Sequence, residues 1–383
     1  MLAAPNDGNT EKTLMRLRNK ILSAAAAVVT VAIVAGLVSI SYDLPCESAP
    51  PPPADVVTMK ATLNRCYGSA DVVSVEDVAK PVPGDNDVLV KVHAASVNAG
   101  DWHSLRGEPY FIRAFSTGIG RPSNPRLGVD FAGTVEAVGQ NVTRFRPGDE
   151  VFGGRSGALA EYVIAGEERA IVLKPADVTF EQAAGVPVAA ITALQALRDH
   201  GGVQPGQRVL INGASGGVGT FAVQLAKAFG AEVTAVCSTR NVTQALAIGA
   251  DYVVDYTRED FTASDARYDL IVDMVGSHSP LTYRRVLAPE GKLVVVGNAS
   301  RDPWIGAFSA ILGPVIYDPF VSQEMLFFIA RLNQSDLTLL AELMRHGKLT
   351  PVVDRVYASD EVREALRYID EGHARGKVIV TFD

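Results

Sequence analysis

Cysteine is scarce in this sequence, and its scarcity excludes one kind of metal site. The 383 residues include only 3 cysteines, at Cys46, Cys66 and Cys237. They are too widely spaced for a Cys-x-x-Cys cluster, and an odd thiol remains in any disulfide scheme. A structural zinc site built from cysteines alone needs four ligands. The sequence therefore cannot form such a site.

Runs of positive charge are also missing. Lys and Arg number 35 against 43 Asp and Glu, which gives a formal net charge of −8. The basic residues form no run of the kind that follows a phosphate backbone, so we expect no nucleic-acid partner. The chain has 48% hydrophobic and 20% charged residues, without a bias towards disorder. At this length we expect two folded units.

One long apolar run lies near the N-terminus. Ile21–Ile40 carries no charge and follows Arg16, Arg18 and Lys20. At about 1.5 Å per residue, a helix of this length spans a hydrocarbon core of about 30 Å. A signal peptide has the same basic-then-apolar order, but its apolar run is typically only about 7–15 residues long. We therefore favour a single-pass membrane anchor or uncleaved signal over residues 21–40, with cleavage as the alternative.

The pattern of apolar residues divides the rest of the sequence into segments. Residues 1–20 form a tail and residues 41–58 a proline-rich linker. Residues 59–180 show short alternating apolar stretches broken by turns, which is typical of a β-rich domain. From residue 181, continuous apolar strands alternate with helix-length segments, which predicts a parallel sheet covered on both faces. The expected strands are Arg208–Ile211, Glu232–Cys237, Tyr252–Val254, Leu270–Val275 and Lys292–Val296.

A glycine-rich motif follows the first of these strands and precedes a predicted helix, Thr220–Phe229. The glycines let the backbone turn tightly and approach a pyrophosphate, and the helix N-terminus offers free N–H groups. A tight turn without a ligand is the alternative, but the order of strand, motif and helix favours a dinucleotide site. The residues expected to hold the pyrophosphate are Gly213, Ala214, Ser215, Gly216, Gly217, Val218 and Gly219.

The residues at the end of the next strand determine whether the site prefers NAD or NADP. NAD-binding sites usually place an Asp or Glu about 20 residues beyond the motif, where it binds the ribose 2′-hydroxyl. This sequence instead has Ser238 and Arg240 in that region. A hydroxyl and a guanidinium can bind a 2′-phosphate by charge-assisted hydrogen bonds, whereas an acid would repel it. We therefore expect NADPH; a solvated surface charge is the alternative for Arg240.

Three further stretches, Ser96–Trp102, Gly128–Gly133 and Phe145–Gly153, resemble the GroES-like domain of medium-chain dehydrogenases/reductases. With the glycine motif and Arg375–Val378, the resemblance covers nearly all of residues 59–383 and points to the zinc-independent, quinone oxidoreductase-like branch. It implies an α/β fold in which a GroES-like β-rich catalytic domain (59–180) precedes a Rossmann doubly wound parallel sheet (181–310). It also implies that residues 311–383 complete the catalytic domain and that the active site lies between the two.

The metal ligands of the zinc-dependent relatives are missing from this sequence. Those relatives carry a cysteine where this chain has Asn98, and Gly-His-Glu where it has Gly128-Val129-Asp130; Pro187 stands near the third ligand position. A catalytic zinc needs about three good protein donors, so we expect no metal. Alcohol oxidation normally relies on a Lewis acid, whereas hydride addition to an enone or quinone needs only hydrogen-bond donors for the developing oxyanion.

The resemblance places four catalytic candidates on the loop at the cleft. Asn98 is the expected direct contact with substrate and Asp101 the organiser of the loop, with capping of the following helix as its alternative role. His103 can donate a proton, since the pKa of a free imidazole is about 6.5. Tyr110 resembles an aromatic residue that lines the cleft. For His103 and Tyr110, a structural role is an equal alternative.

The resemblance also adds cofactor contacts outside the motif. Thr192 is expected on the nicotinamide side, although a bond to its own helical turn is the alternative. Tyr256 is expected beside the adenosine phosphate, and Gly297-Asn298 beside the nicotinamide, at the carboxyl end of a strand. Lys377 is expected to reach the cofactor from the catalytic domain.

We therefore expect an NADPH-dependent reductase whose small-molecule substrate is a quinone or enone, with a homodimer compatible with the resemblance. A zinc-free carbonyl or alcohol dehydrogenase is the alternative within enzymes. A membrane-tethered NADPH sensor without turnover is the alternative outside them. The basic flank before Ile21–Ile40 and the acidic residues after it place the catalytic domain outside the cytoplasm, whereas NADPH is a cytosolic metabolite.

Overall fold

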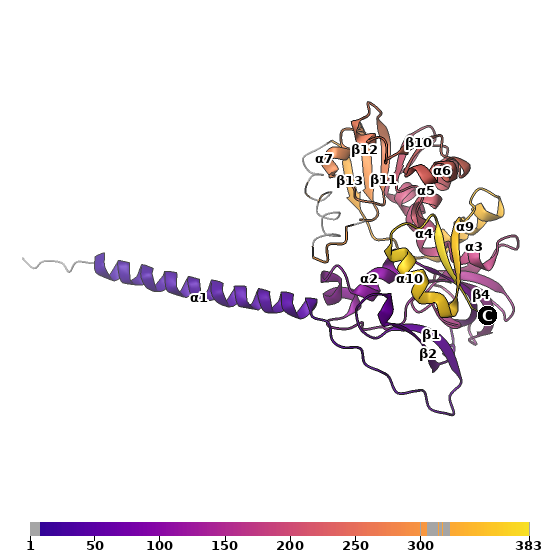
Figure 1. The fold of residues 1–383 in the computed structure, drawn as a ribbon, viewed down its shortest axis with the longest axis horizontal. Helices are drawn as coiled ribbons and strands as arrows, with labels where there is room; N and C mark the ends of the chain where they lie inside the picture. The colour runs from indigo at the N-terminus through magenta and orange to yellow at the C-terminus, as the bar shows by residue number, and fades with distance from the viewer. Residues whose placement is uncertain (1–7, 299, 305–312, 314–315, 317–321, 383) are drawn as a thin grey trace, which may run out of the picture.

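A computed structural model of the chain describes residues 8–298, 300–304, 313, 316 and 322–382. Within them a β-rich unit and an α/β unit pack against each other, and one long helix extends away from both (Figure 1). The α/β, two-unit organisation expected from the sequence is confirmed. The first seven residues of the predicted tail and the predicted boundary at 310/311 lie outside the described residues.

The α/β unit is built on a six-stranded parallel sheet of order β10-β9-β8-β11-β12-β13. This is the order of a Rossmann sheet, in which the direction of winding reverses between the first and fourth strands, here β8 and β11. Most residues of β8, β9 and β11 are buried, which explains their continuous apolar sequences. The strands are β8 (Arg208–Asn212), β9 (Glu232–Cys237), β10 (Tyr252–Asp255), β11 (Tyr268–Asp273), β12 (Leu287–Val295) and β13 (Glu324–Phe327).

One predicted domain boundary is wrong. The sequence places the end of the Rossmann unit at residue 310, but β13 pairs in parallel with β12, with Met325 opposite Leu293. Residues 324–327 therefore belong to the Rossmann sheet and not to the catalytic domain. A strand of four residues is too short for its alternation to be recognised in the sequence.

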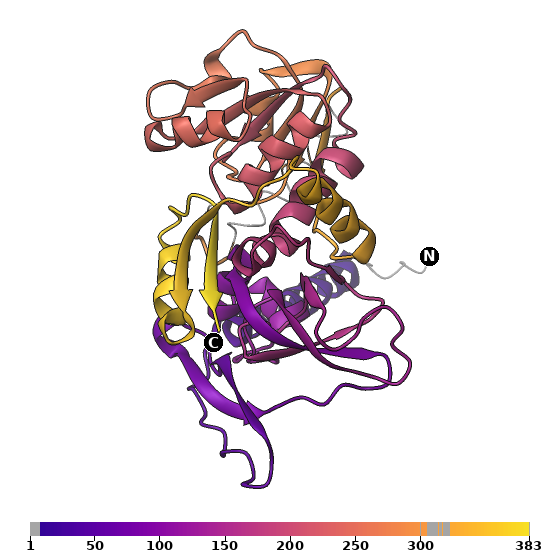
Figure 2. The same cartoon turned by 90° about the vertical axis from the view of Figure 1, so that its right-hand side faces the viewer.

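The β-rich unit contains a sheet of order β14-β15-β3-β4-β5-β7, with β6 paired to β3, and a separate β1-β2 hairpin. Its last strand, β15, pairs antiparallel with β3, so the C-terminus returns to this unit as expected (Figure 2). The strands are β1 (Thr58–Asn64), β2 (Val73–Ala79), β3 (Asp87–Val97), β4 (Asp130–Val138), β5 (Glu150–Gly154), β6 (Tyr162–Gly166), β7 (Ile171–Leu173), β14 (Val353–Ala358) and β15 (Lys377–Thr381).

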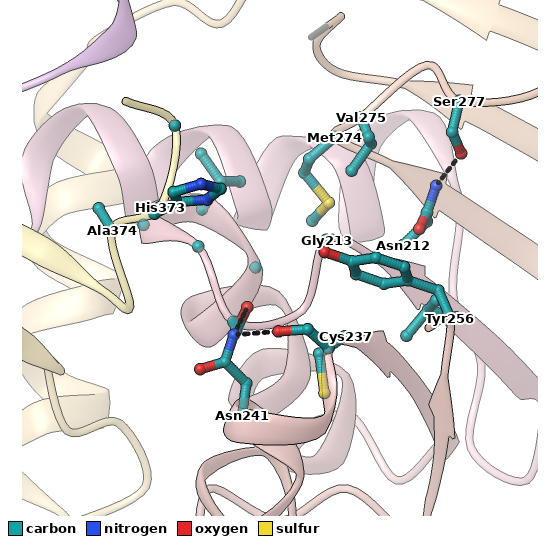
Figure 3. A pocket seen from close by; sticks show the side chains of 18 of the residues that line it. Asn212, Gly213, Cys237, Asn241, Tyr256, Met274, Val275, Ser277, His373 and Ala374 are labelled. Carbon is teal, nitrogen blue, oxygen red and sulfur yellow. Dashed lines mark hydrogen bonds between the residues drawn. The ribbon is translucent and has the colours of Figure 1, made fainter. Parts of the chain in front are cut away.

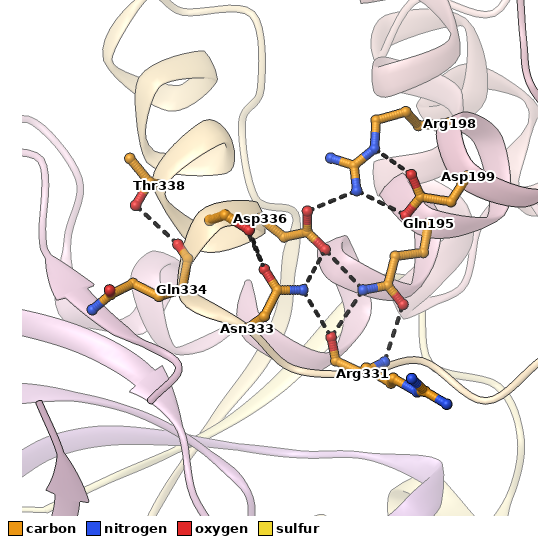
Figure 4. Close-up of polar contacts among 9 residues, drawn as sticks. Gln195, Arg198, Asp199, Arg331, Asn333, Gln334, Asp336 and Thr338 are labelled. Carbon is orange, nitrogen blue, oxygen red and sulfur yellow. Dashed lines mark hydrogen bonds and ion pairs between the residues drawn. The ribbon is translucent and has the colours of Figure 1, made fainter. Parts of the chain in front are cut away.

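The helices connect and cover these sheets. A shared apolar core includes the inner faces of α4 and α5, for example Ile191 and Phe221. A polar network joins α4 to α9: Asp336 accepts hydrogen bonds from Gln195 and Arg198, each at 2.8 Å (Figure 4). The helices are α2 (Ala99–Arg106), α3 (Phe180–Ala184), α4 (Pro187–Gln195), α5 (Gly217–Ala228), α6 (Val242–Ala247), α7 (Pro280–Tyr283), α9 (Gln334–Arg345) and α10 (Val362–Asp370).

The N-terminal helix α1 runs from Gly8 to Ser41 and is longer than the predicted apolar segment, because the charged tail continues it. Its stretch Lys12–Ser41 is long and apolar enough to cross a membrane, and none of its most apolar window is buried in the protein. The sequence suggested that the linker after α1 is only a spacer, but the structure shows that it is also bonded to the β-rich unit. Cys46 forms a disulfide with Cys66, which ties the linker to the β-rich unit and leaves Cys237 as the free, buried thiol.

Candidate active site

A cavity of about 750 Å³ lies between the two units, at the carboxyl ends of the Rossmann strands. Cofactor sites of open parallel sheets occupy this position, outside the strand ends where the winding reverses. Ser238 and Met274 line the cavity from the ends of β9 and β11, while Asn98 and Lys377 line it from the β-rich unit. In Figure 3, Tyr256 and His373 border the same space from opposite sides. The cavity thus joins the predicted nucleotide site to the predicted catalytic loop.

The glycine motif has the geometry that a close pyrophosphate requires. Gly213 adopts a positive φ of 85°, which favours glycine. A Cβ on Gly219 would lie 2.1 Å from the carbonyl oxygen of Gly213, so no side chain fits there. The motif opens α5, whose N-cap is Gly216, and its free N–H groups can bind an anion. Of the predicted motif residues, all except the buried Ala214 line the cavity.

The predicted 2′-phosphate site forms a hollow beside the main cavity. Ser238, Arg240 and Tyr256 line both, together with His373. The Arg240 guanidinium donates a hydrogen bond of 2.8 Å to the carbonyl oxygen of His373, which orients it across the hollow. The structure therefore brings together the three residues that the sequence assigned to the adenosine end.

Asn241 was not among the predicted site residues, although the structure puts it at the centre of this region. Its Nδ2 donates to the hydroxyls of Ser215 at 2.9 Å and Ser238 at 3.2 Å (Figure 3). Its Oδ1 accepts from Arg375 Nε at 2.9 Å. Asn241 therefore connects the glycine motif, the end of β9 and the C-terminal segment. A single polar residue after Arg240 gives no sequence signal for such a role.

Three buried polar side chains meet at the other end of the cavity. Lys377 Nζ donates to Asn98 Oδ1 at 2.5 Å, and Asn98 Nδ2 donates to Asp130 Oδ2 at 3.0 Å. The Lys377 ammonium also lies 3.7 Å from the Asp130 carboxylate. Asp130 accepts further hydrogen bonds from Ser96 Oγ at 2.8 Å and from the Val188 amide at 2.9 Å. We call Lys377, Asn98 and Asp130 the cleft triad.

The Lys377 side chain passes close to two glycines, one of which, Gly217, belongs to the cofactor motif. A Cβ on Gly217 would lie 3.2 Å from Lys377 Cδ, and a Cβ on Gly185 would lie 3.2 Å from Lys377 Cγ. The aliphatic stem therefore passes close to the backbone of both glycines. Lys377, with 3% of its surface exposed, comes from β15 yet lies against the start of α5.

Burial governs the electrostatics of the cleft triad. It lowers the pKa of Lys377, an effect that the nearby Asp130 and Asp101 carboxylates partly offset. It also raises the pKa of Asp130, against the influence of Lys377, Asn98 and Ser96. An ammonium with a lowered pKa gives up its proton more readily than a free lysine does, so Lys377 is suited to donate one.

Asp101 closes a capping box with Asn98 at the start of α2, which is the helix-capping role that the sequence left as its alternative. Its carboxylate accepts from the Asn98 amide at 2.8 Å and from the Gly128 amide at 2.9 Å. Burial raises the pKa of Asp101 to about 6, and these two backbone hydrogen bonds oppose the rise. Asp101 thereby fixes Asn98 at the N-cap of α2 and keeps it facing Asp130.

Three of the four predicted catalytic residues, Asp101, His103 and Tyr110, are not among the residues that line the cavity. His103 Nδ1 donates to the Glu108 carbonyl oxygen at 2.7 Å, and burial lowers its pKa. Tyr110 packs edge-on against Trp304, with ring centroids 4.9 Å apart. His103 and Tyr110 thus have the structural contacts that the sequence left open as alternatives.

Of the remaining cofactor candidates, some line the cavity and others do not. Asn298 lines the cavity, as expected for a residue beside the nicotinamide. Thr192 does not, and its hydroxyl donates at 2.6 Å to the Val188 carbonyl oxygen of its own helix, which was its alternative role. Gly297 is not among the lining residues, and a Cβ on it would come within 2.8 Å of the Met274 carbonyl oxygen.

A catalytic zinc does not fit these residues. Among the described residues, no group of three or more His, Cys, Asp and Glu side chains is arranged to hold a metal. Of the positions that bind zinc in the relatives, Asn98 has its amide bonded on both sides and the Val129 side chain has no donor atom, while the adjacent Asp130 faces an ammonium. A dication placed there would face the positive charge of Lys377.

The comparisons with known proteins agree with this geometry. Residues 84–176 match the family described as "Alcohol dehydrogenase GroES-like domain", and residues 248–380 match "Zinc-binding dehydrogenase". A chloroplastic quinone oxidoreductase, QR1, of Triphysaria versicolor is 34% identical over 82% of this chain and 94% of its own length. A mitochondrial NAD(P)H oxidoreductase, RTN4IP1, of Mus musculus is 35% identical over 77% of this chain and 81% of its own.

A solved structure shows the same architecture. The quinone oxidoreductase from Coxiella burnetii superposes with a TM-score of 0.75 at 30% identity, covering 85% of this chain and all of the other. These relatives are oxidoreductases, and the family uses a nicotinamide cofactor. The chain therefore belongs to the medium-chain dehydrogenase/reductase superfamily, as an oxidoreductase of its quinone oxidoreductase-like branch.

Proposed function

We propose that the protein is an NADPH-dependent reductase of quinones or α,β-unsaturated carbonyl compounds that works without a metal. The observation that carries this proposal is the cleft triad, in which the buried Lys377 ammonium is held by Asn98 and Asp130 at the edge of the cofactor cavity. It supplies positive charge and a proton in a position where relatives described as zinc-binding use a metal.

NADPH is assigned from the adenosine end of the cavity. Ser238 and Arg240 offer a hydroxyl and a guanidinium beside the place where NAD-binding sites usually carry an acid. Asp255, at the end of β10, already accepts from the Thr239 and Thr257 hydroxyls and pairs with Arg258. A 2′-phosphate would therefore find donors on the Arg240 side of the hollow.

NADPH held by the glycine motif and Arg240 would supply a hydride to the β-carbon or ring of the substrate. Negative charge then develops on the substrate oxygen, and a donor aimed at that oxygen lowers the barrier. The Lys377 ammonium has three N–H bonds. If one is directed at Asn98 and one at Asp130, the third is available for the substrate. The same N–H transfers its proton to the oxygen, so that one hydride and one proton are added, and water reprotonates the amine.

Asn98 acts on the substrate through Lys377 in this proposal. Its Nδ2 donates to Asp130 and its Oδ1 accepts from Lys377, so the amide is engaged on both sides and positions the ammonium. Asp101 holds Asn98 in turn through the Asn98 amide N–H. His103 and Tyr110 support the loop in which these residues lie.

NADPH oxidation by the full chain against short-chain quinones, 2-alkenals and saturated ketones tests the proposal. We expect turnover with the quinones or alkenals, and slower or no turnover with the ketones. Faster turnover of saturated ketones would favour the metal-free carbonyl dehydrogenase instead. Tight NADPH binding with no oxidation on any compound would overturn the proposal and favour a sensor.

A further inference from the structure

The C-terminal end of α1 is held by the catalytic domain. Arg113 donates from Nη1 to the carbonyl oxygen of Ile40 at 3.1 Å and pairs with Asp43 at 2.8 Å. The last carbonyls of a helix lack partners within it, and a cation there also complements the helix dipole. The Arg113 side chain is almost fully buried and stacks over Tyr67 and Tyr110. Arg113 therefore joins α1 firmly to the domain.

The residues after the helix continue this attachment. The Leu44 amide donates to the Gly120 carbonyl oxygen at 2.8 Å, and Arg121 pairs with Glu47. One residue before Glu47, Cys46 is joined covalently to Cys66. Residues 40–47 are thus fixed on the segment 113–121, and α1 leaves the body in one direction (Figure 1).

Large apolar side chains are exposed around this attachment. Phe115 is 86% exposed, Tyr42 61%, Ile119 57% and Trp304 41%. Each is close to a residue that holds or extends the attachment. Tyr42 precedes Asp43 and Ile119 precedes Gly120. Phe115 lies in the same turn as Arg113, and Trp304 packs on Tyr110. We call Tyr42, Phe115, Ile119 and Trp304 the apolar rim. Tyrosine and tryptophan are enriched at the membrane interface.

We infer that the apolar rim rests in the lipid headgroup region of the membrane that α1 spans, and that the substrate of the proposed reductase is a quinone or enone with a lipid tail. The second part rests on the proposed function. The occupant of the rim is the bilayer because α1, long and apolar enough to cross it, leaves the domain at the rim. Water-exposed apolar area at the rim would then be buried in lipid.

One short helix, α2, connects the cleft triad to the residues that hold α1. Helix α2 starts after Asn98 and ends at Arg106, whose carbonyl oxygen accepts from Arg113 at 2.9 Å. Its eight residues span about 12 Å. The interfacial layer is roughly 5–8 Å deep on each side of the hydrocarbon core. A substrate bound at Lys377 would therefore need a tail longer than α2 to reach the bilayer, which a lipid tail provides.

Tryptophan fluorescence tests the docking without using activity. The chain has two tryptophans, so Trp102→Phe leaves Trp304 as the single probe. In the full chain reconstituted in nanodiscs, we expect lipids brominated near the headgroup to quench Trp304 by at least about half, and Phe115→Ser with Ile119→Ser to weaken that quenching. Undiminished Trp304 emission in the membrane-inserted protein would overturn the docking.

Kinetics in the same nanodiscs test the substrate. We expect Phe115→Ser with Ile119→Ser to raise the KM for a long-tailed isoprenoid quinone about fivefold or more, with the KM for a water-soluble quinone unchanged. The matched control is Val82→Ser with Ile329→Ser, which changes two residues that are 84% and 79% exposed and lie in other segments. Equal effects on both quinones, or no effect on either, would overturn the lipid-substrate inference.

The two failures are distinguishable. If the unmodified protein does not oxidise NADPH with the water-soluble quinone, the proposed function fails, whereas the quenching of Trp304 still decides the docking. If the unmodified protein oxidises NADPH with the water-soluble quinone, but the rim variant and the control variant have the same KM for the long-tailed quinone, the proposed reductase stands. The inference of a lipid-tailed substrate is then wrong.

Discussion

The Lys377 ammonium lies 2.5 Å from the side-chain oxygen of Asn98, across 279 positions of sequence. Lys377 belongs to the strand that returns to the catalytic domain, and Asn98 stands where zinc-dependent relatives carry a cysteine ligand. The protein thus brings a cation of its own to the catalytic loop and neutralises it with Asp130, 3.7 Å away. The first four of the five predictions below follow from this arrangement and from the cofactor cavity beside it.

Replacing Lys377 with Met should abolish most of the turnover while keeping the length of the side chain. Loss of a general acid typically lowers kcat by about 10²–10⁴. The KM for NADPH should change little, because the motif and Arg240 remain. Lys174→Met is the matched control, since Lys174 is also buried but bonds to Pro175 and Val178 outside the cavity. Equal loss of kcat in both variants would assign Lys377 a structural role.

The same residue predicts the pH dependence. Burial lowers the pKa of Lys377 from its ordinary 10.5. The ammonium is the active form, so kcat should fall as the pH rises through this lowered value, and the midpoint of the alkaline limb should lie below 10.5. In Lys377→Arg kcat should fall, because a guanidinium keeps its proton and cannot transfer it, and the turnover that remains should show no alkaline limb over this range. An alkaline limb that is identical in both proteins would contradict the assignment.

Arg240→Ala should weaken NADPH binding but not NADH binding. Only NADPH loses a charged partner for its 2′-phosphate, at a cost of about 1.5–3 kcal/mol, or roughly 10- to 100-fold in Kd. Arg258→Ala is the control, because Arg258 pairs with Asp255 and is not among the residues lining the cavity or the hollow. Titration of both cofactors by fluorescence measures the effect. Equal losses of affinity for NADPH and NADH would show that Arg240 does not bind the 2′-phosphate.

The purified protein should contain no stoichiometric zinc, and a chelator should leave turnover intact. The reason is the donor chemistry: Asn98 and Val129 occupy ligand positions of the zinc-dependent relatives, and Asp130 is committed to Lys377. Elemental analysis with activity before and after chelation checks this. About one zinc per chain, with activity lost on its removal, would refute the metal-free mechanism.

Local sequence order predicted the cofactor half of the site better than the catalytic half. The glycine motif works through its own backbone, so strand, glycines and helix in succession were enough to place it. The cleft triad needs Asn98, Asp130 and Lys377 from three separate strands or loops, and only the folded sheet shows that β15 lies beside β3. Asn241 and the Cys46–Cys66 disulfide were missed for the same reason.

The final prediction concerns the side of the membrane on which the catalytic domain lies. Lys12, Arg18 and Lys20 precede the apolar part of α1, whereas Asp43 and Glu47 follow it. The positive-inside rule therefore keeps the N-terminus in the cytoplasm and places the catalytic domain outside. The cytosolic supply of NADPH argues for the opposite side, but the charge bias acts during insertion, whatever cofactor the domain later needs.

The Cys46–Cys66 disulfide now supports the outward placement, because such bonds persist in oxidising compartments and are rare where thiols are kept reduced. We expect protease added to intact spheroplasts to digest the catalytic domain, and non-reducing peptide mapping to recover Cys46 joined to Cys66. Full protection of a membrane-bound protein, with both thiols free to react with maleimide after lysis, would place the domain in the cytoplasm. Cys46→Ser should then cost nothing, whereas with the bond formed it should lower stability by about 3 kcal/mol, as expected for a loop of 20 residues.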